Sequence, residues 1–173
     1  MPSDRSPPAS PRSSLWFLAV LALAALYVWW SSSPLPQVVA THFGASGLAN
    51  GYMSHTTYVR FMLGFVVFLP WLVNFAMERV LASPGARINL PNRDHWLSDS
   101  QRASTVDYLM RHMRYFGLML AAFLCGVHAL VVKANALTPP MLDNTRFSVA
   151  LGIYFLAVVV WIVALRRRFR RSP

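Results

Sequence analysis

The stretch that decides the fold class is Phe147–Leu165, which reads FSVALGIYFLAVVVWIVAL and carries no charged side chain. A helix needs about 20 mostly apolar residues to cross the hydrocarbon core of a bilayer. Three earlier stretches meet the same requirement, at about residues 15–31, 58–77 and 115–132. Four segments cannot close a β-barrel, and unpaired backbone groups are too costly in lipid for an open sheet. The sequence therefore predicts an all-α integral membrane protein with four transmembrane helices.

The composition supports this prediction. Of the 173 residues, 55% are hydrophobic and 13% are charged, whereas an ordinary soluble domain carries about 25% charged residues. The net charge of +10 could suggest nucleic acid, but in a chain with few charges basic residues more often flank one side of a membrane. We therefore expect membrane lipid as a partner and no nucleic acid. Cys125 is the single cysteine, which excludes an intrachain disulfide and a multi-cysteine metal site, and no cofactor or metal is expected.

The distribution of basic residues predicts the orientation. Thirteen of them lie in the two terminal tails and the middle loop, and three (Arg60, Lys133 and Arg146) lie on the other side. By the positive-inside rule both termini are cytoplasmic. The 15 arginines against one lysine suggest a GC-rich bacterial source, and hence a bacterial cytoplasmic (inner) membrane. The predicted parts are a disordered cytoplasmic tail (residues 1–13), a four-helix membrane domain (14–165) and a basic cytoplasmic tail (166–173).

The outward loop between the first two spans, residues 34–55, contains no Lys, Arg, Asp or Glu. Its uncharged surface, which contains glycines and aromatic residues, suits contact with a peptide or a lipid. Asn50-Gly51 predicts a tight turn, followed by re-entry into the membrane at Tyr58. The residues predicted to shape an outward binding site are Pro36, His42, Phe43, Gly47, Asn50, Gly51 and Tyr52.

The two histidines of this loop, His42 and His55, allow a metal-binding or pH-sensing interpretation. Zinc normally takes three or four protein ligands, and the loop offers no cysteine or carboxylate as a third. We therefore favour a structural interpretation, in which His42 bonds loop carbonyls and fixes the turn while His55 faces solvent.

The loop also carries a resemblance. Leu35-Pro36, Thr41-His42-Phe43, Gly47 and Asn50-Gly51-Tyr52 together resemble the signature of a bacterial membrane domain of unknown function. That domain also forms the N-terminal part of SdpI-like proteins, which give immunity to the sporulation-delaying toxin and have further spans after it. The resemblance implies a polytopic bacterial envelope protein, and it brings no catalytic residues with it.

The cytoplasmic loop between the second and third spans contains INLPNRDHWL, residues 88–97. One interpretation is docking of a cytoplasmic partner. Another is catalysis, with Asp94 or His95 as a general base and Arg93 as an anion clamp. The structural interpretation pairs Arg93 with Asp94 and places Trp96 at the membrane interface. The residues of the predicted docking cluster are Asn89, Pro91, Asn92, Arg93, Asp94, His95 and Trp96.

Two further patterns concern the helices. Ser98 with Gln101 resembles a capping box, which predicts a helix that starts at residue 98 and continues into the third span. Asn74 and His128 are polar residues within the second and third spans, and we expect them to make hydrogen bonds between helices.

Together these features predict a non-enzymatic binding, regulatory or immunity-like envelope component, whose partner is an envelope protein or peptide. Two alternatives stay open. One is a membrane-embedded enzyme that uses the Asn-Arg-Asp-His-Trp loop, and the other is a small transporter or channel formed by a homo-oligomer.

Overall fold

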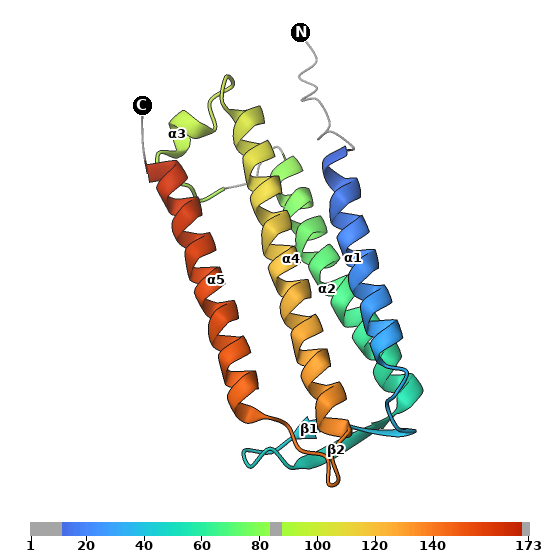
Figure 1. Ribbon diagram of the computed structural model, residues 1–173. Helices are drawn as coiled ribbons and strands as arrows, with labels where there is room; N and C mark the ends of the chain where they lie inside the picture. Colours follow the sequence, from blue (N-terminus) through green and yellow to red (C-terminus); the bar gives the residue numbers. More distant parts are fainter. Residues whose placement is uncertain (1–11, 84–87, 171–173) are drawn as a thin grey trace.

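The computed structural model describes residues 12–83 and 88–170, and its main elements are long helices (Figure 1). Of the predicted disordered tail, residues 1–11 lie outside the described part, and α1 starts at residue 12. Residues 171–173 of the predicted basic tail also lie outside it. In chain order the elements are α1 (Arg12–Ser31), β1 (Val38–Phe43), β2 (Ala49–Ser54), α2 (His55–Ala82), α3 (Arg93–Trp96), α4 (Arg102–Asn135) and α5 (Asn144–Arg170).

Three helices are long and apolar enough to cross a membrane, namely α2, α4 and α5. They contain 28, 34 and 27 residues, or about 40 to 50 Å at 1.5 Å per residue. This exceeds the roughly 30 Å of a hydrocarbon core, so both ends of each helix can extend beyond it. The apolar part of α1, Leu15–Ser31, is shorter than these three. The three long apolar helices α2, α4 and α5 identify the chain as a membrane protein.

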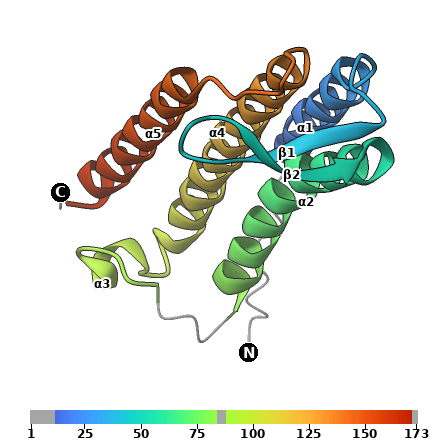
Figure 2. The same cartoon turned by 90° about the horizontal axis from the view of Figure 1, so that it is seen from below.

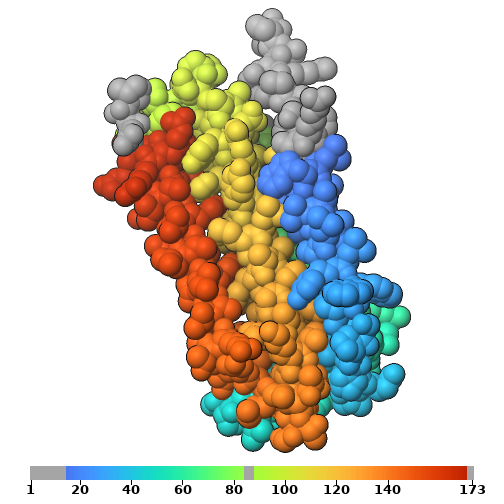
Figure 3. Space-filling view, viewed as in Figure 1, coloured from blue at the N-terminus to red at the C-terminus, as the bar shows by residue number. Residues whose placement is uncertain are grey.

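The helices form a three-helix bundle with one outlying helix. α1, α2 and α4 pack against one another, while α5 packs chiefly against α4 (Figures 1 and 2). The space-filling view shows α4 between the separate columns of α5 and α1 (Figure 3). The bundle core includes Val28, Val66 and Leu124, whereas Phe169 is the buried residue of α5. Within residues 147–165, α5 carries no charged side chain on any face.

A β-hairpin covers one end of the bundle, so the all-α prediction is incomplete. β1 and β2 are antiparallel, with register shifts between Ala40 and His42 and between His42 and Phe43. The tight turn predicted at Asn50-Gly51 is wrong, because these residues lie within β2. The chain reverses instead between Gly44 and Leu48, where the Gly44 amide donates to the Leu48 carbonyl at 2.9 Å. Strand pairing satisfies backbone groups that would otherwise be left open beside the membrane.

The capping box predicted at Ser98 is also absent. The Ser98 hydroxyl donates to the His95 carbonyl at 2.7 Å, and α4 begins only at Arg102. Ser98 therefore ends the short helix α3 rather than starting α4. From Arg102 onward α4 is continuous through the predicted third span.

Candidate functional site

The hairpin is fixed to the bundle by its own buried residues and by the end of α4. Val39 and Ala40 on β1 are fully buried. The Asn135 side chain, at the last position of α4, receives a hydrogen bond from the Ala40 amide at 2.8 Å and donates one to the Ala40 carbonyl at 2.9 Å. This pair imitates the bonding of a neighbouring strand. No sequence pattern had singled out Asn135, whose only signal is a polar residue at the end of an apolar run.

Three of the predicted outward residues form one unit. The Nδ1–H of His42 donates to the side-chain oxygen of Asn50 across the hairpin, so His42 bonds within the loop as expected. His42 is paired with Gly51, where an added Cβ would lie 2.8 Å from the His42 Cβ. Gly51 is therefore needed because the His42 side chain crosses over it.

Gly47 joins the hairpin to the loop between α4 and α5. It has φ of 82°, and an added Cβ would lie 2.6 Å from the Leu142 carbonyl oxygen. The Leu142 amide donates to the Gly47 carbonyl at 2.8 Å, and the Ala49 amide donates to the Pro140 carbonyl at 3.2 Å. The two loops at this end thus form one continuous cap, which local patterns did not predict because it pairs segments about 90 residues apart.

The cap exposes several apolar side chains. Tyr52 is 54% exposed, and Pro36 is exposed at the start of the hairpin, while Phe43 is partly buried against the bundle core. No charged residue occurs between residues 33 and 57. We call the exposed apolar residues of the cap the outer patch; they are Val38, Leu48, Tyr52, Met53 and Met141.

A buried hydrogen-bond network lies beneath the hairpin and links α1, α2 and α4. His128 is fully buried; its Nε2 lies 2.9 Å from the Ser31 hydroxyl and its Nδ1 lies 2.8 Å from the Tyr58 hydroxyl. The Ser31 hydroxyl donates its hydrogen to the Tyr27 carbonyl at 2.6 Å, so it accepts from His128 Nε2–H. Tyr58 then donates to Nδ1. The predicted role of His128 in bonding between helices is confirmed.

The predictions for His55 and Asn74 are wrong. His55 is partly buried at the start of α2, and its Nε2 lies 3.1 Å from the Ser32 carbonyl rather than in solvent. The Asn74 amide donates to Pro70 on its own helix at 2.8 Å. It packs over Gly117 of α4, where an added Cβ would collide with the Asn74 side-chain nitrogen.

The structure divides the predicted docking cluster into buried and exposed residues. Trp96 is buried, and its indole N–H donates to the Phe169 carbonyl at 3.1 Å, while the Asn92 amide lies 3.4 Å from the same oxygen. The Arg168 guanidinium lies 4.6 Å from the centre of the Trp96 ring. Because the last carbonyls of a helix lack partners within it, Trp96 and Asn92 act as a cap for α5. The predicted interfacial role of Trp96 is therefore replaced by a role in packing.

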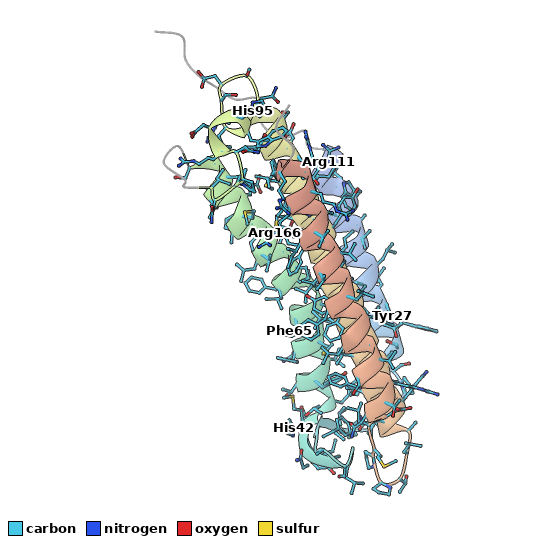
Figure 4. All side chains as sticks on the ribbon, turned by 90° about the vertical axis from the view of Figure 1, so that its left-hand side faces the viewer. Tyr27, His42, Phe65, His95, Arg111 and Arg166 are labelled. Carbon is cyan, nitrogen blue, oxygen red and sulfur yellow. The ribbon has the colours of Figure 1, made fainter. Side chains whose placement is uncertain are left out.

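The other members of this cluster are on the surface. Asn89, Pro91, Arg93 and Asp94 are exposed, and His95 is partly buried against Trp96. The predicted pair between Arg93 and Asp94 does not form among the described residues, whereas Arg146 and Asp143 do form an ion pair. In Figure 4, His42 and His95 lie at opposite ends of the molecule. The two predicted clusters are thus separate sites.

In the described part of the chain, no three His, Cys, Asp or Glu side chains gather in a way that could hold a metal ion.

Residues 17–68, which cover most of α1, the hairpin and the first half of α2, match a family described as "Domain of unknown function (DUF1648)". No curated protein and no solved structure matches the chain.

Proposed function

We propose that this protein is a non-enzymatic component of the bacterial cell envelope that binds a peptide or protein through the outer patch. In this proposal α1 is a fourth transmembrane helix, both termini are cytoplasmic, and the outer patch faces outward from the cytoplasmic (inner) membrane. The orientation rests on the excess of arginines in the tails and the middle loop.

The observation that carries the proposal is the combination of exposure and support at the outer patch. Its apolar side chains stand on a hairpin that is tied to α4 through Asn135 and to the α4–α5 loop through Gly47. Exposed apolar groups on a supported backbone mark interaction sites in proteins, and a preformed surface loses little conformational entropy on binding. An apolar peptide fits this surface because the hairpin has no charge to recognise an ionic ligand.

The resemblance to SdpI-like proteins implies a kind of partner for the outer patch. The resemblance implies an immunity-like role, in which the partner is a membrane-active peptide that approaches from outside. We rank this role above the enzyme alternative, because Arg93 and Asp94 are exposed on the surface.

One labelling experiment tests both the orientation and the binding. Tyr52→Cys and Asp94→Cys are placed separately in a Cys125→Ser background, and intact cells are treated with a charged, membrane-impermeant thiol reagent that carries a photo-crosslinker. We expect Tyr52→Cys to be labelled and Asp94→Cys to be labelled only after permeabilisation. Irradiation should then join Tyr52→Cys to a discrete peptide or protein of the envelope.

The matched control is Asp94→Cys in permeabilised cells, where the same envelope partner should be absent. Labelling of Asp94→Cys in intact cells would reverse the proposed orientation. Adducts of Tyr52→Cys with lipid alone would overturn the binding proposal and leave the orientation intact.

A further inference from the structure

A small cavity lies among α1, α2 and α4, at the end of the bundle opposite the hairpin. Its volume is about 110 Å³, and its wall includes Phe17, Trp71, Asn74, Glu78 and Arg114. It is separate from the outer patch and from the predicted cytoplasmic cluster, neither of which contributes a residue to it. The side chain of Arg114 is only 6% exposed within the protein.

The depth of the cavity corresponds to one surface of the hydrocarbon core. Asn74 is 19 residues along α2 from His55, and Arg114 is 21 residues along α4 from Asn135. At 1.5 Å per residue both lie about 30 Å from the hairpin end, which is the thickness of the hydrocarbon core. With the hairpin end of α2 and α4 taken as one surface of the core, the cavity lies at the level of the other surface, where phosphates and headgroups begin.

An open hydrogen-bond position faces this cavity. Asn74 is 7% exposed, and its side-chain N–H donates to the Pro70 carbonyl. Gly117 leaves the space that the Asn74 amide occupies, because a Cβ at position 117 would collide with the amide nitrogen. Its side-chain oxygen is the one buried side-chain polar atom of the described residues that lacks a hydrogen-bond partner. A buried acceptor without a partner costs about 1–3 kcal/mol, so a ligand with an N–H or O–H donor would be stabilised there.

The charges around the cavity have both signs. The Arg114 guanidinium is buried in the wall, and the carboxylate of Glu78 is exposed at the edge. Glu78 and Asp107 attract the Arg114 charge, and Arg111 opposes it. A simple anion would meet the repulsion of Glu78, and a simple cation would meet that of Arg114. A zwitterion that carries its phosphate and its ammonium a few atoms apart can satisfy both groups.

We propose that this cavity binds the headgroup of a phospholipid whose headgroup ends in a primary ammonium, of the phosphoethanolamine type. The ammonium enters the cavity and donates to the open oxygen of Asn74, while the phosphate interacts with the Arg114 guanidinium in the wall. Liquid water occupies about 30 Å³ per molecule, so a cavity of about 110 Å³ has room for a group of three or four heavy atoms. An ethanolamine arm has that size.

The test measures which lipids the full-length protein retains, either in lipid nanodiscs or in native mass spectrometry. The lipids are phosphatidylethanolamine, its mono- and dimethyl derivatives, phosphatidylcholine and phosphatidylglycerol, all with the same acyl chains. We expect retention of phosphatidylethanolamine to exceed that of phosphatidylcholine by about tenfold, because a quaternary ammonium cannot donate a hydrogen bond to Asn74. The preference should fall with each added methyl group.

Two variants of one position provide the matched control. Asn74→Leu has a similar shape but no acceptor, and it should retain all lipids of the series equally. Asn74→Asp keeps an acceptor at the same place and should keep the preference for the primary ammonium. If Asn74→Leu does not fold, the methylation series on the wild-type protein decides by itself.

Equal retention of phosphatidylethanolamine and phosphatidylcholine by the wild type would overturn the proposal and leave water as the partner of Asn74. Stronger retention of phosphatidylglycerol than of phosphatidylethanolamine would also overturn it, in favour of a general attraction of arginines for anionic lipid. If the folded Asn74→Leu variant kept the full preference for phosphatidylethanolamine over phosphatidylcholine, the selectivity would arise elsewhere in the protein.

Discussion

At the hairpin end of the bundle the buried polar side chains are paired within the protein, whereas at the opposite end one of them keeps an open position. His128 has both ring nitrogens bonded, to Ser31 and to Tyr58, and Asn135 makes two bonds to the backbone of Ala40. Asn74 has its oxygen unpaired beside a cavity at headgroup depth. The difference indicates that the paired groups hold the fold, and that the unpaired one is available for a ligand.

The largest effect that follows from this comparison is expected at His128. Replacing His128 by Ala removes a fully buried ring and leaves the hydroxyls of Ser31 and Tyr58 without their partner. We expect the free energy of unfolding to fall by about 3–5 kcal/mol, measured by denaturation with sodium dodecyl sulfate in mixed micelles free of added phospholipid.

Asn74→Leu is the matched variant at the other end of the bundle. Asn74→Leu removes the unpaired buried oxygen, which is stabilising, and the hydrogen bond to the Pro70 carbonyl, which is destabilising by a similar amount. The two effects offset each other, so this variant should change the same free energy by less than about 1 kcal/mol. The comparison between the two ends would not hold if His128→Ala were as stable as the wild type, or if Asn74→Leu were the more damaging of the two.

A smaller effect is expected at the cap formed by the hairpin and the α4–α5 loop. Gly47→Ala places a side chain at φ of 82° and 2.6 Å from the Leu142 carbonyl oxygen. Left-handed backbone at a residue other than glycine costs about 1–3 kcal/mol, so the cap should loosen by that amount. Hydrogen exchange at the Leu142 and Ala49 amides, which bond across the two loops, measures the loss.

Gly44→Ala is the control for this prediction. Gly44 lies in the same turn without a positive φ, and an added Cβ would be 3.5 Å from its nearest neighbour, the Asn50 side chain. Exchange at Leu142 and Ala49 should therefore stay close to that of the wild type. Equal loosening in both variants would mean that the turn tolerates no side chain at all and that the contact with Leu142 is not the cause.

The sequence predicted the parts of the fold that depend on local apolar length. The ranges 58–77, 115–132 and 147–165 lie within α2, α4 and α5, each of which is long and apolar enough to cross a membrane. Local length could not predict the hairpin, because its strands contain six residues each and are stabilised by pairing and by contacts with Asn135. It could not predict that α5 lies apart from the bundle, since an all-apolar helix reads the same against protein or lipid.

The candidate sites were predictable to different extents for the same reason. His42, Gly47 and Gly51 were selected from a local pattern, and the structure gives each of them a specific contact. Arg114 was missed because an arginine beside an apolar run has the same sequence signal whether it faces headgroups or turns into the bundle. Only the packing of Gly117 and Asn74 beside it distinguishes the two outcomes.

The smallest predicted effect concerns Trp96 and tests whether this residue is a structural cap or a docking residue. Trp96→Phe removes the indole N–H that donates to the Phe169 carbonyl but keeps a ring for packing against Phe169 and Arg168. One hydrogen bond contributes about 1 kcal/mol, so amide exchange in the last turn of α5 should accelerate by about fivefold, while exchange in α1 and α2 should not change.

Since Arg93 is exposed and outside this cap, Arg93→Ala should leave exchange in α5 as it is. Acceleration in Arg93→Ala, or none in Trp96→Phe, would mean that the end of α5 is held by other contacts, and the docking interpretation of Trp96 would then regain its place.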